Sequence, residues 1–162
     1  MSFRRWPEPP GGPAGHDPRS AYVERFWLGV LGPSATWIIR RLADEFDANP
    51  EGFDVDRSTF ARSIGLSDAK GTESPFGRSL QRCIMFGLVR ESPHGFETRR
   101  RVPDVPPRQL ARMNVEMRTA HEEWMHRTWT TDVTRIAEQL CAAGFDQRSA
   151  TTAADVLVSV SS

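Results

Sequence analysis

Arg78, Gln81 and Arg82 lie within five residues of one another, and their side chains can recognise the edge of a nucleic-acid base. Arginine can donate two hydrogen bonds to guanine O6 and N7, and glutamine can pair with adenine N6 and N7 in a major groove wide enough for a helix. In an α-helix their spacing places all three on one side, opposite an apolar stripe that begins at Phe76. We therefore expect a helix over 74–86 that presents these side chains outward.

Signals for the two ends of a helix flank these residues. Ser74 is a suitable N-cap and Pro75 a suitable first helical residue, while Gly87 follows the last apolar position. The hydroxyl groups of Ser74 and Ser79, with the free amides of the first turn, have the chemistry to bind phosphate oxygens.

The densest positive charge in the chain is Arg99-Arg100-Arg101, which follows the turn residues Ser92-Pro93-His94-Gly95. We predict two strands, over 88–91 and 96–102, joined by that turn into a hairpin. Alternate strand residues face opposite sides, so Arg99 and Arg101 would share one face and Arg100 the other. We expect two of the three arginines to contact phosphate or the minor groove, with His94 at the turn as an addition; the alternative is a solvated basic strand end.

The charges are unevenly distributed along a chain that is neutral as a whole, with 21 basic and 21 acidic residues. Residues 21–60 carry a net charge of −3, whereas residues 61–101 carry +4 and include Lys70, the one lysine. A surface that neutralises phosphates requires such a local excess, although an ordinary solvated helix face would also accommodate it. The predicted DNA-contacting residues are Lys70, Ser74, Arg78, Ser79, Gln81, Arg82, His94, Arg99, Arg100 and Arg101.

Apolar spacing upstream predicts the elements that must position this surface. Helices are expected over 22–32 and 33–48, with glycine and proline at their junction. A strand over 53–55 is short, and Asp56 is a good N-cap for a helix over 57–64. The order of elements is then helix, helix, short strand, helix, loop, helix and hairpin.

That order, and several short motifs, resemble the winged helix-turn-helix. Phe60-Ala61-Arg62-Ser63-Ile64-Gly65-Leu66-Ser67 is similar to the L-A-x-x-L-G-L-S signature of its positioning helix, and Phe86-Gly87-Leu88-Val89 resembles the G-L-[VI] that leaves its recognition helix. The chain resembles actinobacterial winged-helix proteins over 22–102. Leu31-Gly32-Pro33-Ser34-Ala35 is more weakly similar to the winged-helix module of DnaD-type primosomal proteins. The resemblance implies DNA binding, although the loop over 66–73 exceeds the 3–4 residues of a standard helix-turn-helix.

The rest of the chain divides by composition. We predict a disordered Pro/Gly-rich arm over 1–20, a winged-helix domain over 21–103, C-terminal helices over 104–145 and a flexible tail over 146–162.

A long helix from about Arg108 and a last helix over 132–143 are expected in the C-terminal part. Apolar residues at alternating spacings of three and four predict a seam for a homodimer, with packing onto the same chain as the alternative. The predicted dimerisation residues are Leu110, Met113, Met117 and Trp124.

Several classes of function are excluded by what the sequence lacks. No apolar run approaches the ~18 residues of a membrane helix, and the start has no signal-peptide pattern, so we expect a cytoplasmic protein with no membrane partner. Cys83 and Cys141 fit neither a disulfide framework nor a zinc site. His121 and His126 are five residues apart rather than four, which argues against a shared metal ion. We expect no metal, no cofactor and no enzymatic activity.

The sequence predicts a mainly α protein with a small β-hairpin, organised as a winged helix-turn-helix plus C-terminal helices. Its predicted function is binding of double-stranded DNA as a homodimer, in the control of transcription or of mobile elements. The alternative is a winged-helix module that binds another protein in a replication or regulatory assembly, with a partner held through the N-terminal arm or the C-terminal tail.

Overall fold

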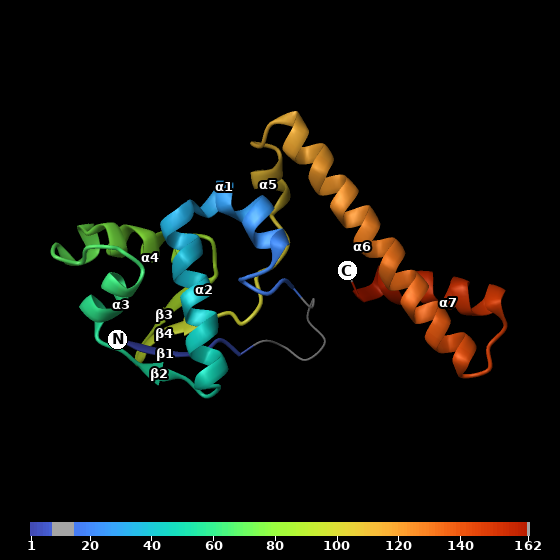
Figure 1. The fold of residues 1–162 in the computed structure, drawn as a ribbon, viewed down its shortest axis with the longest axis horizontal. Helices are drawn as coiled ribbons and strands as arrows, with labels where there is room; N and C mark the ends of the chain where they lie inside the picture. The colour runs from blue at the N-terminus through green and yellow to red at the C-terminus, as the bar shows by residue number, and fades with distance from the viewer. Residues whose placement is uncertain (8–14, 162) are drawn as a thin grey trace. The chain divides into compact units, whose positions relative to one another are not determined.

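A computed structural model describes residues 1–7 and 15–161 of the chain. The described part is mainly helical with a small four-stranded sheet (Figure 1). Its contacts divide it into two compact units, which we call the N-terminal unit (residues 1–7 and 15–105) and the C-terminal unit (residues 106–161). The mainly helical class predicted from sequence is therefore confirmed, whereas the sheet is larger than the single hairpin expected.

The helices of the N-terminal unit follow the predicted cap signals closely. A π-helical turn over Val23–Trp27 leads into α1 (Leu28–Leu31), and Gly32, at φ 78°, separates α1 from α2 (Pro33–Ala48). The later helices of this unit are α3 (Arg57–Ser63) and α4 (Pro75–Met85), with a 3₁₀ turn over Gly71–Glu73 between them. The Asp56 carboxylate accepts from Thr59 N–H at 2.8 Å, which confirms the predicted N-cap of α3.

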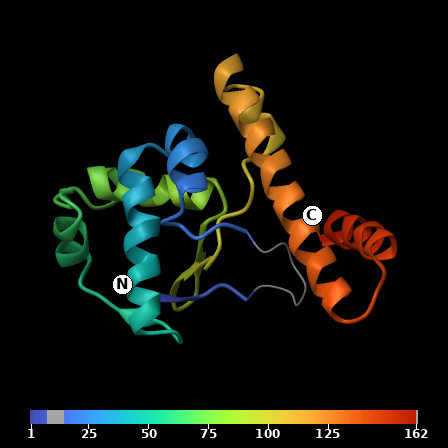
Figure 2. The same ribbon diagram turned by 45° about the vertical axis from the view of Figure 1, so that its right-hand side comes forward.

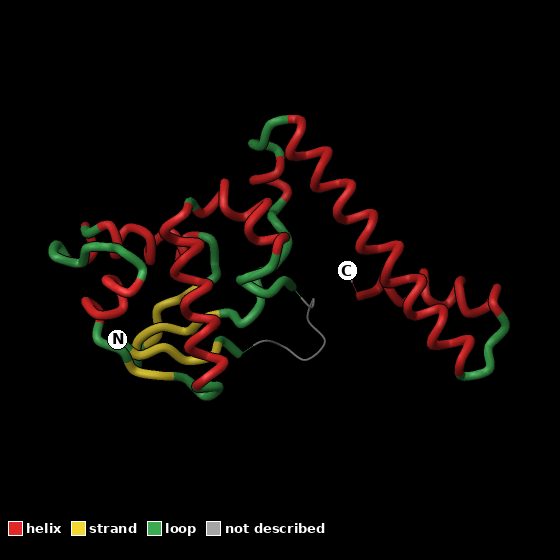
Figure 3. Tube along the Cα trace, in the orientation of Figure 1, coloured by secondary structure: helices red, strands yellow, loops and turns green. Residues whose placement is uncertain are grey.

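The sheet, whose strands are yellow in Figure 3, has the strand order β2-β1-β4-β3. Its strands are β1 (Ser2–Arg5), β2 (Phe53–Asp54), β3 (Val89–Ser92) and β4 (Gly95–Thr98). β3 and β4 form the predicted antiparallel hairpin, while β1 lies antiparallel to β2 and parallel to β4.

Strand β1 corrects the prediction of a disordered arm over 1–20. Phe3 is fully buried, and its ring lies 5.4 Å from that of Phe53 and 5.5 Å from that of Phe96. The strand supplies hydrogen-bonding partners for β2 on one side and for β4 on the other, and it removes an aromatic ring from water. Farther along, His16 forms a bridge with Val102. Residues 8–14 of the predicted arm lie outside the described residues.

The core of the N-terminal unit is built from large side chains. Its fully buried residues include Trp27, Tyr22, Phe26 and Phe46. Phe46 of α2 contacts Phe53 of β2 edge to face, with ring centroids 5.2 Å apart. Figure 2 shows α2 running beside the sheet to which this contact joins it.

The C-terminal unit differs from its prediction at three points. A four-residue helix, α5 (Pro107–Leu110), is followed by a separate long helix, α6 (Val115–Ala142), because the Asn114 side chain caps α6 by accepting from Met117 N–H at 2.9 Å. The predicted dimerisation seam is thus interrupted, because Leu110 ends α5, Met113 lies between the helices, and Met117 and Trp124 belong to α6. The helix predicted over 132–143 is the second half of α6.

The third difference is the tail over 146–162, which forms the helix α7 (Gln147–Ser161). Gly144, at φ 100°, reverses the chain after α6, and α7 then packs against α6. Ala150, Ala154 and Val158 recur every four residues and are buried, so α7 has an apolar face. Ser162 lies outside the described residues.

Candidate nucleic-acid interface

Helix α4 has the two faces that its sequence predicts. Phe76, Leu80 and Cys83 are buried, whereas Arg78 and Gln81 are exposed on the opposite side. Arg82 and Met85 are also exposed there. Since α4 contains no acidic residue, this outward face carries two positive charges and one amide.

Ser74, predicted to contact phosphate, is instead occupied within the fold. It is 1% exposed, and its hydroxyl oxygen accepts from Gly77 N–H at 2.9 Å as the N-cap of α4. The same hydroxyl donates to the Gly71 carbonyl oxygen at 2.5 Å and lies 3.1 Å from Asp68 Oδ1. A buried side chain in this position fixes the start of the helix and cannot reach a nucleic acid. Ser79 is half-buried, and its hydroxyl donates to the Pro75 carbonyl oxygen at 2.8 Å.

The loop before α4 is longer than in a standard helix-turn-helix, and specific contacts hold it. The Arg57 Nε–H donates to both carboxylate oxygens of Asp68 at 2.9 Å, and that carboxylate is largely buried. The loop backbone also packs tightly on α4, because a Cβ atom at Gly77 would lie 2.4 Å from the Gly71 carbonyl oxygen. Lys70 lies exposed in this loop.

The arginines of α4 have internal partners although both are exposed. Arg78 Nη1 donates to the Glu73 carbonyl oxygen at 2.6 Å, just before the helix begins. Arg82 donates from Nε and Nη2 to the Val30 carbonyl oxygen of α1, at 3.1 and 2.6 Å. These contacts use one N–H of Arg78 and two of Arg82, out of five in each guanidinium group. Both side chains are thus held in defined orientations with further donors available.

The three consecutive arginines do not form the strand face predicted for them. The strand β4 ends at Thr98, and the chain then turns to pair Val102 with His16. Arg99 Nε donates to the Gly87 carbonyl oxygen at 3.0 Å, so this side chain lies against the end of α4.

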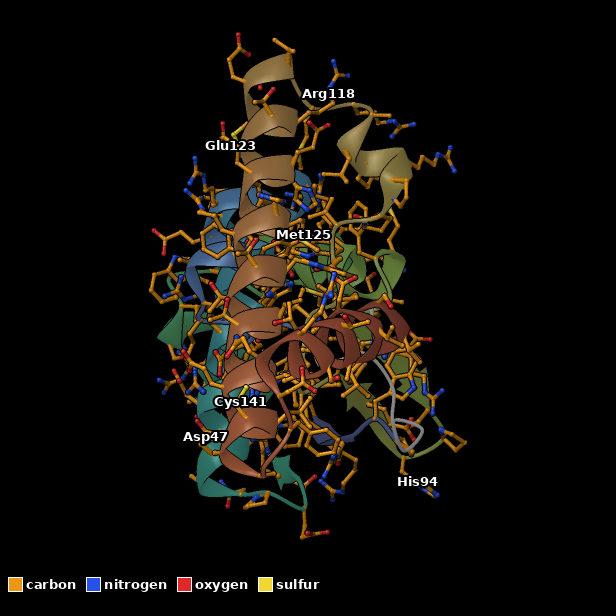
Figure 4. The ribbon with its side chains drawn as sticks, turned by 90° about the vertical axis from the view of Figure 1, so that its right-hand side faces the viewer. Asp47, His94, Arg118, Glu123, Met125 and Cys141 are labelled. Atoms are coloured by element: carbon orange, nitrogen blue, oxygen red, sulfur yellow. The ribbon has the colours of Figure 1, made fainter. Side chains whose placement is uncertain are left out.

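The other two arginines of the run separate. Arg100 Nη2 donates to an Asp47 carboxylate oxygen at 3.1 Å, and Nη1 donates to the Phe46 carbonyl oxygen at the end of α2. Arg101 is exposed. His94 is exposed at the turn of the hairpin and points away from it (Figure 4). Of the four basic residues predicted to contact DNA in this region, only Arg101 and His94 are exposed.

The structure adds Trp6, from the arm predicted to be disordered, to this region. The Trp6 ring lies 4.3 Å from the Arg90 guanidinium carbon and 4.4 Å from that of Arg99. Its backbone N–H donates to the Thr98 carbonyl oxygen at 2.9 Å and so continues the pairing of β1 with β4. The aromatic ring thereby holds two cations of the hairpin.

Ion pairs also define an acidic end of α2. Arg19 contacts Asp17, Asp44 and Asp47, at 3.0, 2.9 and 2.6 Å. The hydrogen bonds from Arg19 lower the pKa of Asp17 below its usual value. Together with Arg100, these contacts pair the negative charge at this end of α2 with arginines.

The buried cysteine of α4 and the predicted dimerisation residues lie outside this interface. Cys83 is fully buried, and desolvation raises the pKa of its thiol to about 12, which suits a core residue rather than a nucleophile. Among the predicted dimerisation residues, Leu110 and Met113 precede α6 while Met117 and Trp124 belong to it, and all four are half-buried.

Searches of the described residues give two negative findings. No group of three or more His, Cys, Asp or Glu side chains there is arranged to hold a metal ion. None of the described helices combines the length and the apolar character needed to cross a bilayer.

The fold and the site define a mainly helical protein with a small sheet. At the candidate interface, helix α4 contains no acidic residue and exposes one face. Comparisons with protein-family models, with curated proteins and with solved structures find no significant match.

Proposed function

We propose that the N-terminal unit is a winged-helix module that binds double-stranded DNA, with α4 in the major groove and the hairpin of β3 and β4 on the neighbouring backbone. The observation that carries this proposal is the outward face of α4. It presents Arg78, Gln81 and Arg82 together, without a carboxylate that would repel phosphate.

Within this proposal the exposed side chains have different tasks. Gln81 and Arg78 read base edges, because both are exposed on the outward face of the helix and retain hydrogen-bonding groups. Arg82 is fixed by Val30, so it contacts the nearest phosphate or base with the N–H groups that remain. Lys70 and His94 contribute at the loop and at the hairpin turn, where both are exposed.

Arg101 is a third candidate for a phosphate contact, since it is the exposed member of its run. Arg99, Arg100 and Ser74 act as structural residues in this scheme, because they are half-buried or buried and their polar groups bond within the unit. A module that reads a defined sequence would serve the control of transcription or of a mobile element.

The proposal is tested with a duplex selected from random DNA by the full-length protein. We expect Arg78→Ala and Gln81→Ala each to weaken binding to that duplex by about 1–3 kcal/mol, as loss of one base contact does. The matched control is Arg118→Ala, an exposed arginine of α6 in the C-terminal unit (Figure 4). Unchanged affinity in both α4 variants, with normal circular dichroism, would remove α4 from the interface.

A second function is favoured by two exposed apolar side chains of the same unit. Trp37 of α2 is 58% exposed and Met85 of α4 is 73% exposed. Trp37 also lines a pocket of about 270 Å³ with Arg41, Ser63 and Ile64. These features suit a surface that binds another protein. Absence of DNA binding at low salt would favour this second function.

A further inference from the structure

Helix α7 has a second apolar stripe besides the one that packs on α6. Val156 is 55% exposed and Val160 is 82% exposed, and they lie one turn apart on the side opposite Ala150 and Ala154. Phe145, just before the helix, is 54% exposed. With Leu157, which is 50% exposed, four large apolar side chains are therefore exposed within sixteen residues.

The contact between α6 and α7 buries little apolar surface compared with the aromatic core of the N-terminal unit. Its buried members are Ala137, Ala150, Ala154 and Val158, with larger side chains such as Ile136 and Leu140 only partly covered. An alanine methyl group removes little apolar surface from water, whereas an isolated helical hairpin depends on its packed face for stability. Burial of the outer apolar side chains would therefore add to the stability of the C-terminal unit.

The charges of α7 indicate what covers its outer stripe. Arg148 and Asp155 are the charged residues of this helix, and both are exposed. Because they are seven residues apart, they lie two turns from each other on the same edge of the outer stripe. If a second α7 runs antiparallel along this stripe, Arg148 of each copy lies opposite Asp155 of the other. The pattern of charge is self-complementary.

The sizes of the side chains follow the same symmetry. In such a pair the middle of each stripe consists of Ser149, Thr152 and Ala153, whose small side chains allow two helices to approach closely. Val160 of each copy then lies beside Phe145 of the other, so that the large groups cover each other at the two ends. This is the arrangement of an isologous interface, in which residue i contacts residue j and j contacts i.

We propose that the protein dimerises through antiparallel pairing of α7 with α7 of a second copy, which completes a four-helix bundle from two α6–α7 hairpins. This surface replaces the seam of Leu110, Met113, Met117 and Trp124 that the sequence predicts. It goes beyond the proposed DNA binding and does not depend on it.

Charge reversal tests the pairing by sedimentation equilibrium of the full-length protein. Arg148→Asp places two carboxylates opposite each other twice in the dimer, and Asp155→Arg does the same with two guanidinium groups. We expect each single variant to raise the dimer Kd at least tenfold. The double variant Arg148→Asp/Asp155→Arg restores the pairing and returns the Kd to within a few-fold of that of the wild type. A mixture of the two single variants forms heterodimers.

Val160→Glu provides a second, independent test, because it introduces a charge into the apolar end of the stripe. We expect it to give a monomer with unchanged helical circular dichroism, since the side chain faces away from α6. The control is Arg118→Asp, at an exposed position of α6, which should leave the dimer Kd unchanged.

A wild-type chain that is monomeric at high concentration, or a dimer that neither single reversal weakens, would overturn the proposed pairing. DNA affinity for a single half-site separates the two proposals. It depends on Arg78 and Gln81 if the N-terminal unit binds DNA, whatever the state of α7.

Discussion

The two units of this protein are stabilised in opposite ways. In the N-terminal unit, segments distant in sequence meet in an aromatic core, so that Phe3 contacts Phe53, Phe60 and Phe96. In the C-terminal unit, two consecutive helices meet mainly through small side chains such as Ala150 and Ala154, and larger apolar side chains such as Val160 stay exposed. The N-terminal unit encloses a large aromatic core, whereas the buried cluster of the C-terminal unit is small.

The arginines of the N-terminal unit show how a local excess of charge can differ from a binding surface. Arg99 and Arg100 belong to the most basic run of the sequence, yet both are half-buried and donate to backbone carbonyl oxygens within the fold. Arg78 and Gln81 contribute less charge and are exposed together on one helix. The accessible face of α4, rather than the number of arginines, is the reason to place DNA there.

The largest effect is expected from Phe3→Ala, which removes a fully buried ring from the middle of the sheet. We expect the free energy of unfolding to fall by about 3–5 kcal/mol, as for other buried aromatic residues. Urea unfolding followed by tryptophan fluorescence measures this loss. Val156→Ala on the exposed stripe of α7 is the comparison. In the monomeric Val160→Glu variant, we expect it to lower the free energy of unfolding by less than about 0.5 kcal/mol. Equal effects at the two positions would contradict the contrast between the units.

Ser74→Ala separates a structural role from a DNA contact. Loss of an N-cap costs about 1–2 kcal/mol of stability. Since Ser74 is buried, the dependence of DNA affinity on salt should be unchanged where the variant remains folded. Chemical denaturation and anisotropy titration of the same preparation measure both quantities. If the variant kept its full stability but its DNA affinity depended less steeply on salt, Ser74 would be a DNA-contacting residue after all.

Trp6→Ala tests whether the N-terminal strand also holds the hairpin. Its ring contacts Arg90 and Arg99, and a double-mutant cycle with Arg99→Ala should give a coupling free energy of about 0.5–1 kcal/mol. Thermal unfolding of the four proteins supplies the values. Strict additivity would show that the stacked cations contribute nothing to the stability of this unit.

The smallest effect concerns Asp17, whose pKa is lowered in the folded protein by hydrogen bonds from Arg19. A depressed folded pKa stabilises the protein fully above the unfolded value of 3.8, and this contribution is lost as the pH falls through the folded pKa. Because the group is partly exposed, we expect at most about 1 kcal/mol. Asp17→Asn should flatten the stability profile below pH 4 by that amount. An identical acid profile in the variant would rule out this contribution.

The parts of the fold that the sequence predicts are those determined by neighbouring residues. Asp56 caps α3, Ser74 caps α4, and the hairpin follows the turn around His94, because each signal acts within a few positions. Strand β1 could not be predicted in this way, since its partners lie about fifty and ninety residues farther along the chain.

The same distinction applies to the candidate site. The exposed side of α4 follows from helical periodicity, so Arg78 and Gln81 are placed correctly as outward residues. The inward role of Arg100 depends on Asp47, which tertiary folding brings to it. Helix α7 differs from the predicted flexible tail because its buried face consists mainly of alanines. Among the many Ser and Thr residues of this segment, alanines give only a weak apolar periodicity.

The central claim, that the N-terminal unit binds duplex DNA, is tested most directly by anisotropy titration of the wild-type protein with labelled duplex DNA at two salt concentrations. We expect salt-sensitive binding, with log K falling linearly against log salt and a slope that reports several neutralised phosphates. Sequencing the retained DNA should reveal an enriched motif. Absence of binding at low salt would contradict the claim and assign the exposed face of α4 to a protein partner.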